Sequence, residues 1–154
     1  MSGIKKWGPQ TWIFFHTFAC KIDGKFFESN RDQCLTLIKN ICAALPCPYC
    51  MKHAVSFMKN VNTSNVTTKA ELNEMLFQFH NLVNKRLRKS VQDPKTLDIY
   101  KYSRIDIALV NFINGYSRKY GSLMAGTPSM QTRRRSVARG VQEWMQKHWR
   151  YFQG

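Results

Sequence analysis

The sequence has few glycines and prolines and no long run of apolar residues. With 8 Gly and 5 Pro among 154 residues, it lacks the turn-forming residues that a β-sandwich or barrel uses. No stretch approaches the roughly 18–20 consecutive apolar residues of a membrane span, so no membrane association is expected. The apolar segment 12–20 contains His16 and Thr17 and lacks a small-residue cleavage pattern, so a secretory signal is not expected either.

Acidic residues are also scarce. The chain has 24 basic and 9 acidic side chains, a net charge of +15. Residues 1–98 carry 14 basic and 7 acidic side chains and residues 99–154 carry 10 and 2, so the excess is densest in the tail. A basic balance favours phosphate-bearing partners, namely nucleic acid, anionic lipid or a dinucleotide cofactor, and does not choose among them.

No cysteine follows Cys50, and the five cysteines lie at positions 20, 34, 42, 47 and 50. An odd number without a signal peptide is not typical of a disulfide-stapled secreted protein. Cys47 and Cys50 have the spacing of a redox-active pair. The same spacing suits half a zinc site, which His53 and either Cys42 or His80 would complete. Two inert buried thiols are the third interpretation.

Apolar residues recur at helical spacing along most of the chain. The pattern predicts a helix over 12–22, a connection over 21–30 and a second helix that starts at Ser29 with Asp32 and ends at Pro46. A third helix begins at Cys47, and Thr68 with Glu71 forms the capping box of a fourth. The apolar stripe of the fourth helix includes Leu82 and Leu87. With no alternating strand, the fold class is all-α, a four-helix bundle.

The tail beyond residue 102 shows two further helical patterns, over 105–116 and 137–148, separated by a linker at 121–129. We therefore divide the chain into a domain at 1–102 and a basic helical C-terminal extension at 103–154. We expect the extension to be a docking or oligomerisation element.

Two clusters carry chemistry. At a helix N-terminus the free amides and the dipole lower the pKa of one thiol of the Cys47–Cys50 pair and so favour thiol–disulfide exchange. On the fourth helix, His80 and Asn84 share a face on which a planar ring can stack. Basic side chains follow them in positions to neutralise phosphates: Lys85, Arg86, Arg88 and Lys89.

Together these residues resemble the Erv/ALR family of FAD-linked sulfhydryl oxidases. The family pattern W-x-x-x-H is matched by Trp12 and His16, and its C-x-x-C by Cys47 and Cys50. Its H-N-x-V-N-x-x-L-x-K is matched in full by residues 80–89. The chain is most similar to the short versions found in large DNA viruses. The resemblance covers residues 7–100 and implies a short fifth helix after the fourth.

The resemblance implies FAD as cofactor and a route for two electrons. They pass from substrate thiols to the Cys47–Cys50 pair, then to FAD and then to O2, giving H2O2. Cys50 would be the flavin-proximal thiol and Cys47 the sulfur that exchanges with substrate. The residues implied to bind the cofactor are Gly8, Trp12, His16, His53, His80, Asn81, Val83, Asn84, Lys85, Leu87, Lys89 and Tyr100, with Tyr102 as an alternative to Tyr100.

The implied partners are protein thiols, O2 and a second copy of the chain, since family members are usually homodimers. Nucleic-acid binding through the basic tail is not expected. The second, structural cysteine pair of many cellular members is absent, and Cys20 or Cys42 is an alternative electron relay. The resemblance to viral proteins implies a location in the host cytoplasm, at the viral factory, and in the virus particle. The alternative function is a zinc-binding, nucleic-acid-associated module that uses Cys42, Cys47, Cys50, His53 and the basic tail.

Overall fold

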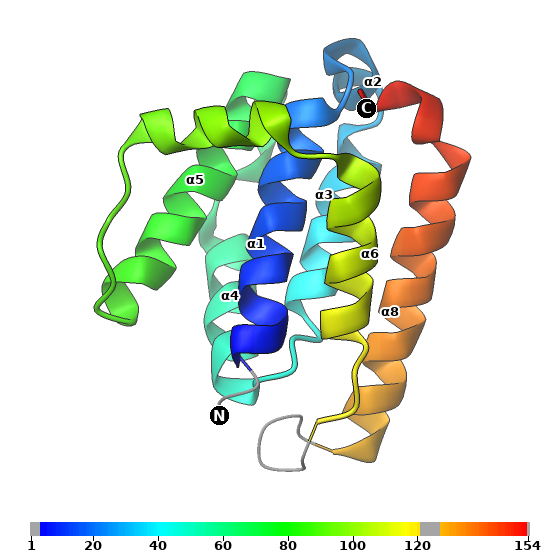
Figure 1. Ribbon diagram of the computed structural model, residues 1–154. Helices are drawn as coiled ribbons and strands as arrows, with labels where there is room; N and C mark the ends of the chain where they lie inside the picture. The colour runs from blue at the N-terminus through cyan, green and yellow to red at the C-terminus, as the bar shows by residue number, and fades with distance from the viewer. Residues whose placement is uncertain (1–3, 121–126, 154) are drawn as a thin grey trace.

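The computed structural model describes residues 4–120 and 127–153, which form a bundle of helices (Figure 1). Within those ranges there is no β-sheet, only an isolated bridge between Ile22 and Phe152, so the all-α prediction is confirmed. The α-helices are α1 (Ile4–Lys21), α2 (Gly24–Ser29), α3 (Arg31–Cys42), α4 (Pro48–Asn60), α5 (Lys69–Arg86), α6 (Ile105–Tyr116) and α8 (Pro128–Lys147). The 3-10 helices are η1 (Thr63–Asn65), η2 (Pro94–Tyr102) and η3 (Trp149–Tyr151). No helix in the described ranges is both long and apolar enough to cross a bilayer.

Local capping signals place the N-terminal starts of α4 and α5 where the sequence predicts them. Cys47 is the N-cap of α4, followed by Pro48 in the first turn. Thr68 and Glu71 form the complete capping box of α5. These side chains satisfy backbone amides that a helix start leaves unpaired, so the start of each helix is specified locally.

Several boundaries differ from the prediction. Helix α1 begins at Ile4 rather than at residue 12, α3 ends at Cys42 before Pro46, and α8 begins at Pro128 rather than at residue 137. The expected connection at 21–30 contains helix α2, because the carboxylate of Asp23 caps the amide of Phe26 and the side chains of Phe26 and Phe27 are buried. The predicted start of α3 at Ser29 is wrong. Ser29 ends α2, and α3 begins after Asn30 without a side-chain cap.

The segment after α5 also differs in detail. The expected short fifth helix is the 3-10 helix η2, which packs against α1. Leu82 and Leu87, predicted to lie in the apolar stripe of α5, are 49% and 39% exposed. The helix leaves the bundle toward its C-terminal end, so apolar periodicity there does not report burial.

The tail completes the hydrophobic core. Helix α6 packs along α1, and α8 packs against α3 and α6 on the side away from α4 and α5 (Figure 1). The ring of Phe112 stacks on Phe14 with centroids 4.8 Å apart. The Tyr116 hydroxyl donates a hydrogen bond to the Ile41 carbonyl at 2.9 Å. Both segments thus share one core, and the division at residue 102 stays a prediction.

Gly115 marks a close approach of α6 to α1. A Cβ built there would lie 2.5 Å from the Lys6 carbonyl oxygen, whereas a Cβ at Gly140 on α8 meets nothing within 4 Å. We therefore expect Gly115→Ala to lower the free energy of unfolding by about 1–3 kcal/mol through overpacking. Gly140→Ala should raise it by roughly 0.5–1 kcal/mol, because alanine is the better helix former. Urea denaturation measures both, and a stabilising Gly115→Ala would contradict this packing.

Candidate active site

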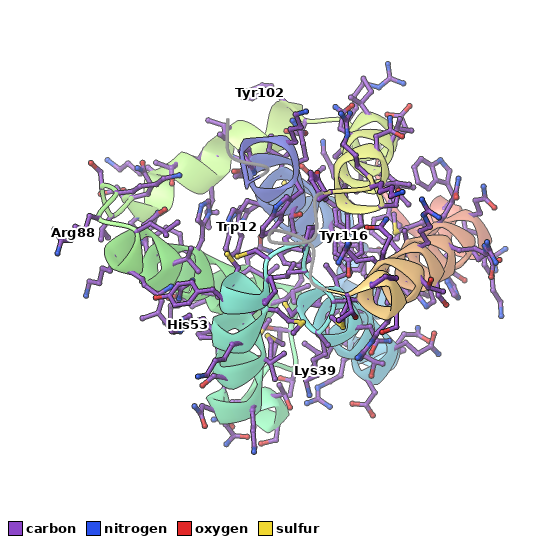
Figure 2. The ribbon with its side chains drawn as sticks, turned by 90° about the horizontal axis from the view of Figure 1, so that it is seen from below. Trp12, Lys39, His53, Arg88, Tyr102 and Tyr116 are labelled. Carbon is purple, nitrogen blue, oxygen red and sulfur yellow. The ribbon has the colours of Figure 1, made fainter. Side chains whose placement is uncertain are left out.

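A cavity of about 570 Å³ lies beside α1 and α5, reaching the first turns of α4 and the 3-10 helix η2. Figure 2 shows Trp12 in the interior of the bundle near this region. The predicted site residues that line the cavity are Gly8, Trp12, His16, Cys50, His80, Asn81, Val83, Asn84, Leu87, Lys89 and Tyr100. Four segments distant in sequence therefore meet at one site.

Stacked aromatic rings join the two long helices at this cavity. The indole of Trp12 lies flat on the His80 imidazole, with centroids 4.1 Å apart and planes 2° apart. Phe79 meets the same indole edge-on at 4.9 Å. Across the cavity, Tyr100 brings its ring to 4.9 Å from His16. The walls therefore present flat, apolar surfaces of the kind that hold a planar ring system.

The two histidines form a direct pair across the α1–α5 junction. His16 Nε2 and His80 Nδ1 are 2.9 Å apart. Burial, with a smaller contribution from the nearby His80, lowers the pKa of His16 to about 3. Burial also lowers the pKa of His80 to about 4, with a contribution from Lys89. Both rings are therefore neutral at physiological pH, and the N–H of one donates a hydrogen bond to the ring nitrogen of the other.

Asn81 holds the loop that follows α5. Its amide nitrogen donates to the Gln92 carbonyl at 3.0 Å, and its oxygen accepts from the Gln92 amide at 2.8 Å. A second donor reaches that oxygen, the side-chain amide of Asn84 at 3.2 Å. Because Gln92 lines the cavity, Asn81 positions part of the cavity wall through backbone contacts.

The last turn of α5 is closed by a Schellman-type cap. The Lys89 amide donates to the Asn84 carbonyl at 2.8 Å and the Arg88 amide to the Lys85 carbonyl at 3.1 Å. Arg88 takes the left-handed conformation, with φ of 58°, that this cap requires and that glycine usually supplies. The turn brings Lys89 back to the cavity, while Arg88 extends from the free end of α5 (Figure 2).

The two cysteines of the pair have different surroundings. Cys47 is the N-cap of α4, and its sulfur accepts a hydrogen bond from the Cys50 amide at 3.2 Å. Cys47 is 9% exposed and is not among the residues that line the cavity, whereas Cys50 is. One sulfur therefore borders the cavity and the other caps the helix outside it.

The expected fall in the pKa of one thiol of the pair does not occur at Cys50. Burial, followed by the hydrogen bond and charge of Cys47, raises the pKa of the Cys50 thiol to about 12, and the cation of Arg86 opposes this rise. The apolar cavity wall outweighs the helix N-terminus at this sulfur. Cys42 also lines the cavity, and burial raises its pKa to about 12.

Three predicted binding residues lie outside the cavity lining or at its edge. Lys85 is exposed on α5. His53 faces the Tyr49 ring at a centroid distance of 4.5 Å, where α4 approaches α5 (Figure 2). Tyr102, the alternative to Tyr100, is 88% exposed. Their roles toward a cofactor stay predictions.

Sequence reasoning did not single out several lining residues. The most informative are Phe79, Gln92 and Leu97. Arg86, by contrast, is one of the four cations expected to neutralise phosphates, and it lines the cavity. Gln92 and Leu97 belong to the loop and to η2, whose position depends on contacts distant in sequence.

Three properties of the cavity fit FAD: its volume, its unpaired polar atoms and its cations. Its volume lies within the range of ligand pockets, roughly 300–1,000 Å³. Three buried donors or acceptors on its wall have no partner in the described part of the chain: Trp7 Nε1, His16 Nδ1 and Arg86 Nε. The cations Arg86 and Lys89 line the same cavity as the aromatic stack. A flat ring system joined to a pyrophosphate satisfies both kinds of surface.

The buried histidine pair predicts a pH dependence of stability. Below pH 6.5 the His16 imidazole becomes protonated in the unfolded chain, whereas in the folded chain it stays neutral until the pH reaches about 3. Stability is therefore complete above pH 6.5 and falls as pH decreases, by about 1.4 kcal/mol per pH unit for each such histidine. The free energy of unfolding, measured by urea denaturation at several pH values between 6.5 and 5, should fall less steeply with decreasing pH for His16→Phe than for the unsubstituted protein. Equal slopes would contradict the burial of a neutral His16.

Comparison with known proteins gives a consistent result. Residues 9–103 match the Erv1 / Alr family. The chain is 29% identical over 115 residues to an FAD-linked sulfhydryl oxidase of African swine fever virus, covering 72% of this chain and 96% of that protein. It is 30% identical over 89 residues to a putative FAD-linked sulfhydryl oxidase of Invertebrate iridescent virus 6, covering 54% and 80%.

A probable FAD-linked sulfhydryl oxidase of Fowlpox virus is 30% identical over 78 residues, covering 51% of this chain and 74% of that protein. No solved structure matches. The family match spans more than half of the chain and includes α1, α4, α5 and η2, the elements that build the cavity. The chain belongs to the Erv1 / Alr family.

Proposed function

We propose that the protein is an FAD-linked thiol oxidase that forms disulfides in other proteins. The observation that carries this function is the position of Cys50. Its side chain borders a cavity with flat aromatic walls and two cations, while its partner Cys47 lies three residues away outside that cavity. The pair can therefore receive electrons on one side and pass them on at the other.

The exchange at the cysteine pair follows ordinary thiol chemistry. With Cys47 and Cys50 joined as a disulfide, a substrate thiolate attacks the Cys47 sulfur, and Cys50 leaves as a thiolate. A second substrate thiolate then attacks its own mixed disulfide, so that the substrate disulfide forms and Cys47 is released. Two electrons enter the pair, and two protons are lost from the substrate. The Arg86 cation near Cys50 favours the thiolate that leaves.

The cofactor completes the reaction. FAD, when bound, accepts the two electrons and passes them to O2, which gives H2O2. The residues of this chain supply binding and orientation. Trp12, His80 and Tyr100 offer flat surfaces, Arg86 and Lys89 offer cations for the pyrophosphate, and Asn81 keeps the loop after α5 in place.

The zinc-binding alternative receives no support from the structure. In the described residues no three His, Cys, Asp or Glu side chains are grouped so that they could hold a metal ion. His53 faces Tyr49, and Cys42 lies in the buried cavity wall. The donor set proposed for zinc therefore does not converge.

Protein thiols and O2 are the proposed partners, together with a second copy of the chain. Helices α6 and α8 cover parts of α1 and α3, so a homodimer would use surfaces other than those parts. We keep the viral factory in the host cytoplasm and the virus particle as the proposed location. The viral origin of the similar proteins supports it. Sedimentation of the purified protein and imaging of tagged protein in infected cells test these two points.

The first functional prediction concerns cofactor binding. The protein should bind one FAD per chain, visible by the flavin absorption spectrum. Trp12→Ala should weaken FAD binding about tenfold or more, because the stacked aromatic wall is lost. Trp149→Ala, at an exposed position on η3, is the matched control and should bind normally. Titration followed by flavin fluorescence measures both. A protein that folds correctly and takes up no FAD would refute the proposed function.

The second functional prediction separates the roles of the two thiols. Cys47→Ser should retain FAD and lose oxidation of protein thiols, because the exchanging sulfur is gone. Cys50→Ser should lose turnover on every thiol, because no sulfur borders the cavity from α4. Oxygen consumption with reduced protein substrate and with dithiothreitol measures the difference.

Cys20→Ser is the control for the thiol variants. Cys20 lies on α1, half-buried, and is not among the cavity-lining residues. Normal turnover of this variant is expected, and a large loss would instead support the relay alternative at Cys20. Near-normal activity of either Cys47→Ser or Cys50→Ser would show that the assigned roles are wrong.

A further inference from the structure

The surface beside the cysteine pair includes residues that lie outside the cavity lining. We define the exchange surface as six exposed or half-exposed residues on α4 and α5: Tyr49, Lys52, His53, Leu82, Lys85 and Arg86. Both helices bring these residues to the same end of the molecule, where α4 begins and α5 ends (Figure 1). Only Arg86 among them also lines the cavity.

Contacts join the two helices across this surface. The Arg86 guanidinium lies over the Tyr49 ring at 5.8 Å, and the ring of His53 meets Tyr49 at 4.5 Å. Partial burial and then the charges of Arg86 and Lys52 lower the pKa of His53. Leu82 lies one helical turn before Arg86 and so shares its face. Tyr49, His53 and Arg86 are therefore in contact across the two helices, with Leu82 on the same face of α5 as Arg86.

The exchange surface is cationic without acidic neighbours. Helix α4 contains no Asp or Glu, and none occurs between Glu74 and Asp93. The described ion pairs of the chain join Arg31 to Asp32, Lys101 to Asp98 and Arg104 to Asp106, all elsewhere. Lys52, Lys85 and Arg86 thus have no described anionic partner within the protein.

Exposed apolar residues accompany these cations. Tyr49 is 59% exposed and Leu82 49% exposed, although both flank charged positions. Cys47, by contrast, is 9% exposed, so a substrate sulfur must be guided to it. A surface with free cations and exposed apolar side chains beside a recessed thiol suits a polypeptide, because a small thiol needs no such contacts.

We propose that the exchange surface binds cysteine-bearing segments of acidic polypeptides and thereby selects the substrates of the oxidase. This inference rests on the proposed function. Acidic residues next to a cysteine raise the pKa of its thiol and lower the fraction of reactive thiolate. Cations of the exchange surface offset that effect for the docked segment, because they stabilise the thiolate that attacks the disulfide. The docked thiolate then attacks the Cys47 sulfur, and Cys50 leaves as a thiolate.

The test compares peptides of one length, each with two cysteines and a central leucine, flanked by Asp and Glu or by Lys and Arg. Oxygen consumption by the FAD-bound protein gives kcat/KM for each peptide. Each value is divided by the rate of the same peptide with the neutral reagent 4,4′-dithiodipyridine, which corrects for intrinsic thiol reactivity. Dithiothreitol turnover is measured alongside.

We expect the acidic peptide to be preferred about tenfold or more at low salt, with the preference mostly lost near 0.5 M salt through screening. Lys52→Glu should reduce the preference by at least about threefold. Lys147→Glu changes the net charge equally at an exposed position on α8 and should leave the preference intact.

The outcomes separate the two claims. Equal corrected kcat/KM for both peptides, with normal dithiothreitol turnover, would overturn the exchange surface and leave the proposed function standing. An equal loss of preference in Lys52→Glu and Lys147→Glu would overturn it too, because only the overall charge would then act. Absence of dithiothreitol oxidation in the FAD-bound protein would refute the proposed function itself.

Discussion

The contact between α1 and α5 at Trp12, His16 and His80 is the constraint on which the site depends. The indole lies flat on one imidazole, and the two imidazoles share a hydrogen bond in a buried setting. Neither ring can charge without a large cost, because desolvation disfavours the imidazolium form. The junction therefore stays neutral and rigid, and it keeps the cavity wall flat where α4 brings Cys50 to its edge.

The C-terminal segment supports this junction from behind. Helix α6 lies so close to α1 that only glycine fits at position 115. The end of the chain returns to the α1–α2 corner, where the Asp23 amide donates to the Tyr151 carbonyl at 2.7 Å and the Gln153 amide to the Lys21 carbonyl at 3.0 Å. The extension thus contributes to the rigidity of α1, the helix that supplies half of the aromatic stack.

Local sequence signals predicted the elements, and long-range contacts explain what they missed. The Thr68–Glu71 box and the Cys47–Pro48 start were readable because each is satisfied within one turn. Apolar spacing could not show that the tail closes the core, since periodicity does not name a partner helix. Likewise, residues 80–89 carried the resemblance to the family, whereas the contacts of Asn81 with Gln92 and the raised pKa of Cys50 depend on tertiary packing.

The central claim is that Cys50 borders the site of the flavin ring. A crystal structure of the protein with FAD tests it most directly. The account predicts the isoalloxazine in the cavity between α1 and α5, with the Cys50 sulfur in van der Waals contact and the Cys47 sulfur farther away. A flavin bound elsewhere, or a metal ion held between the two sulfurs, would contradict it.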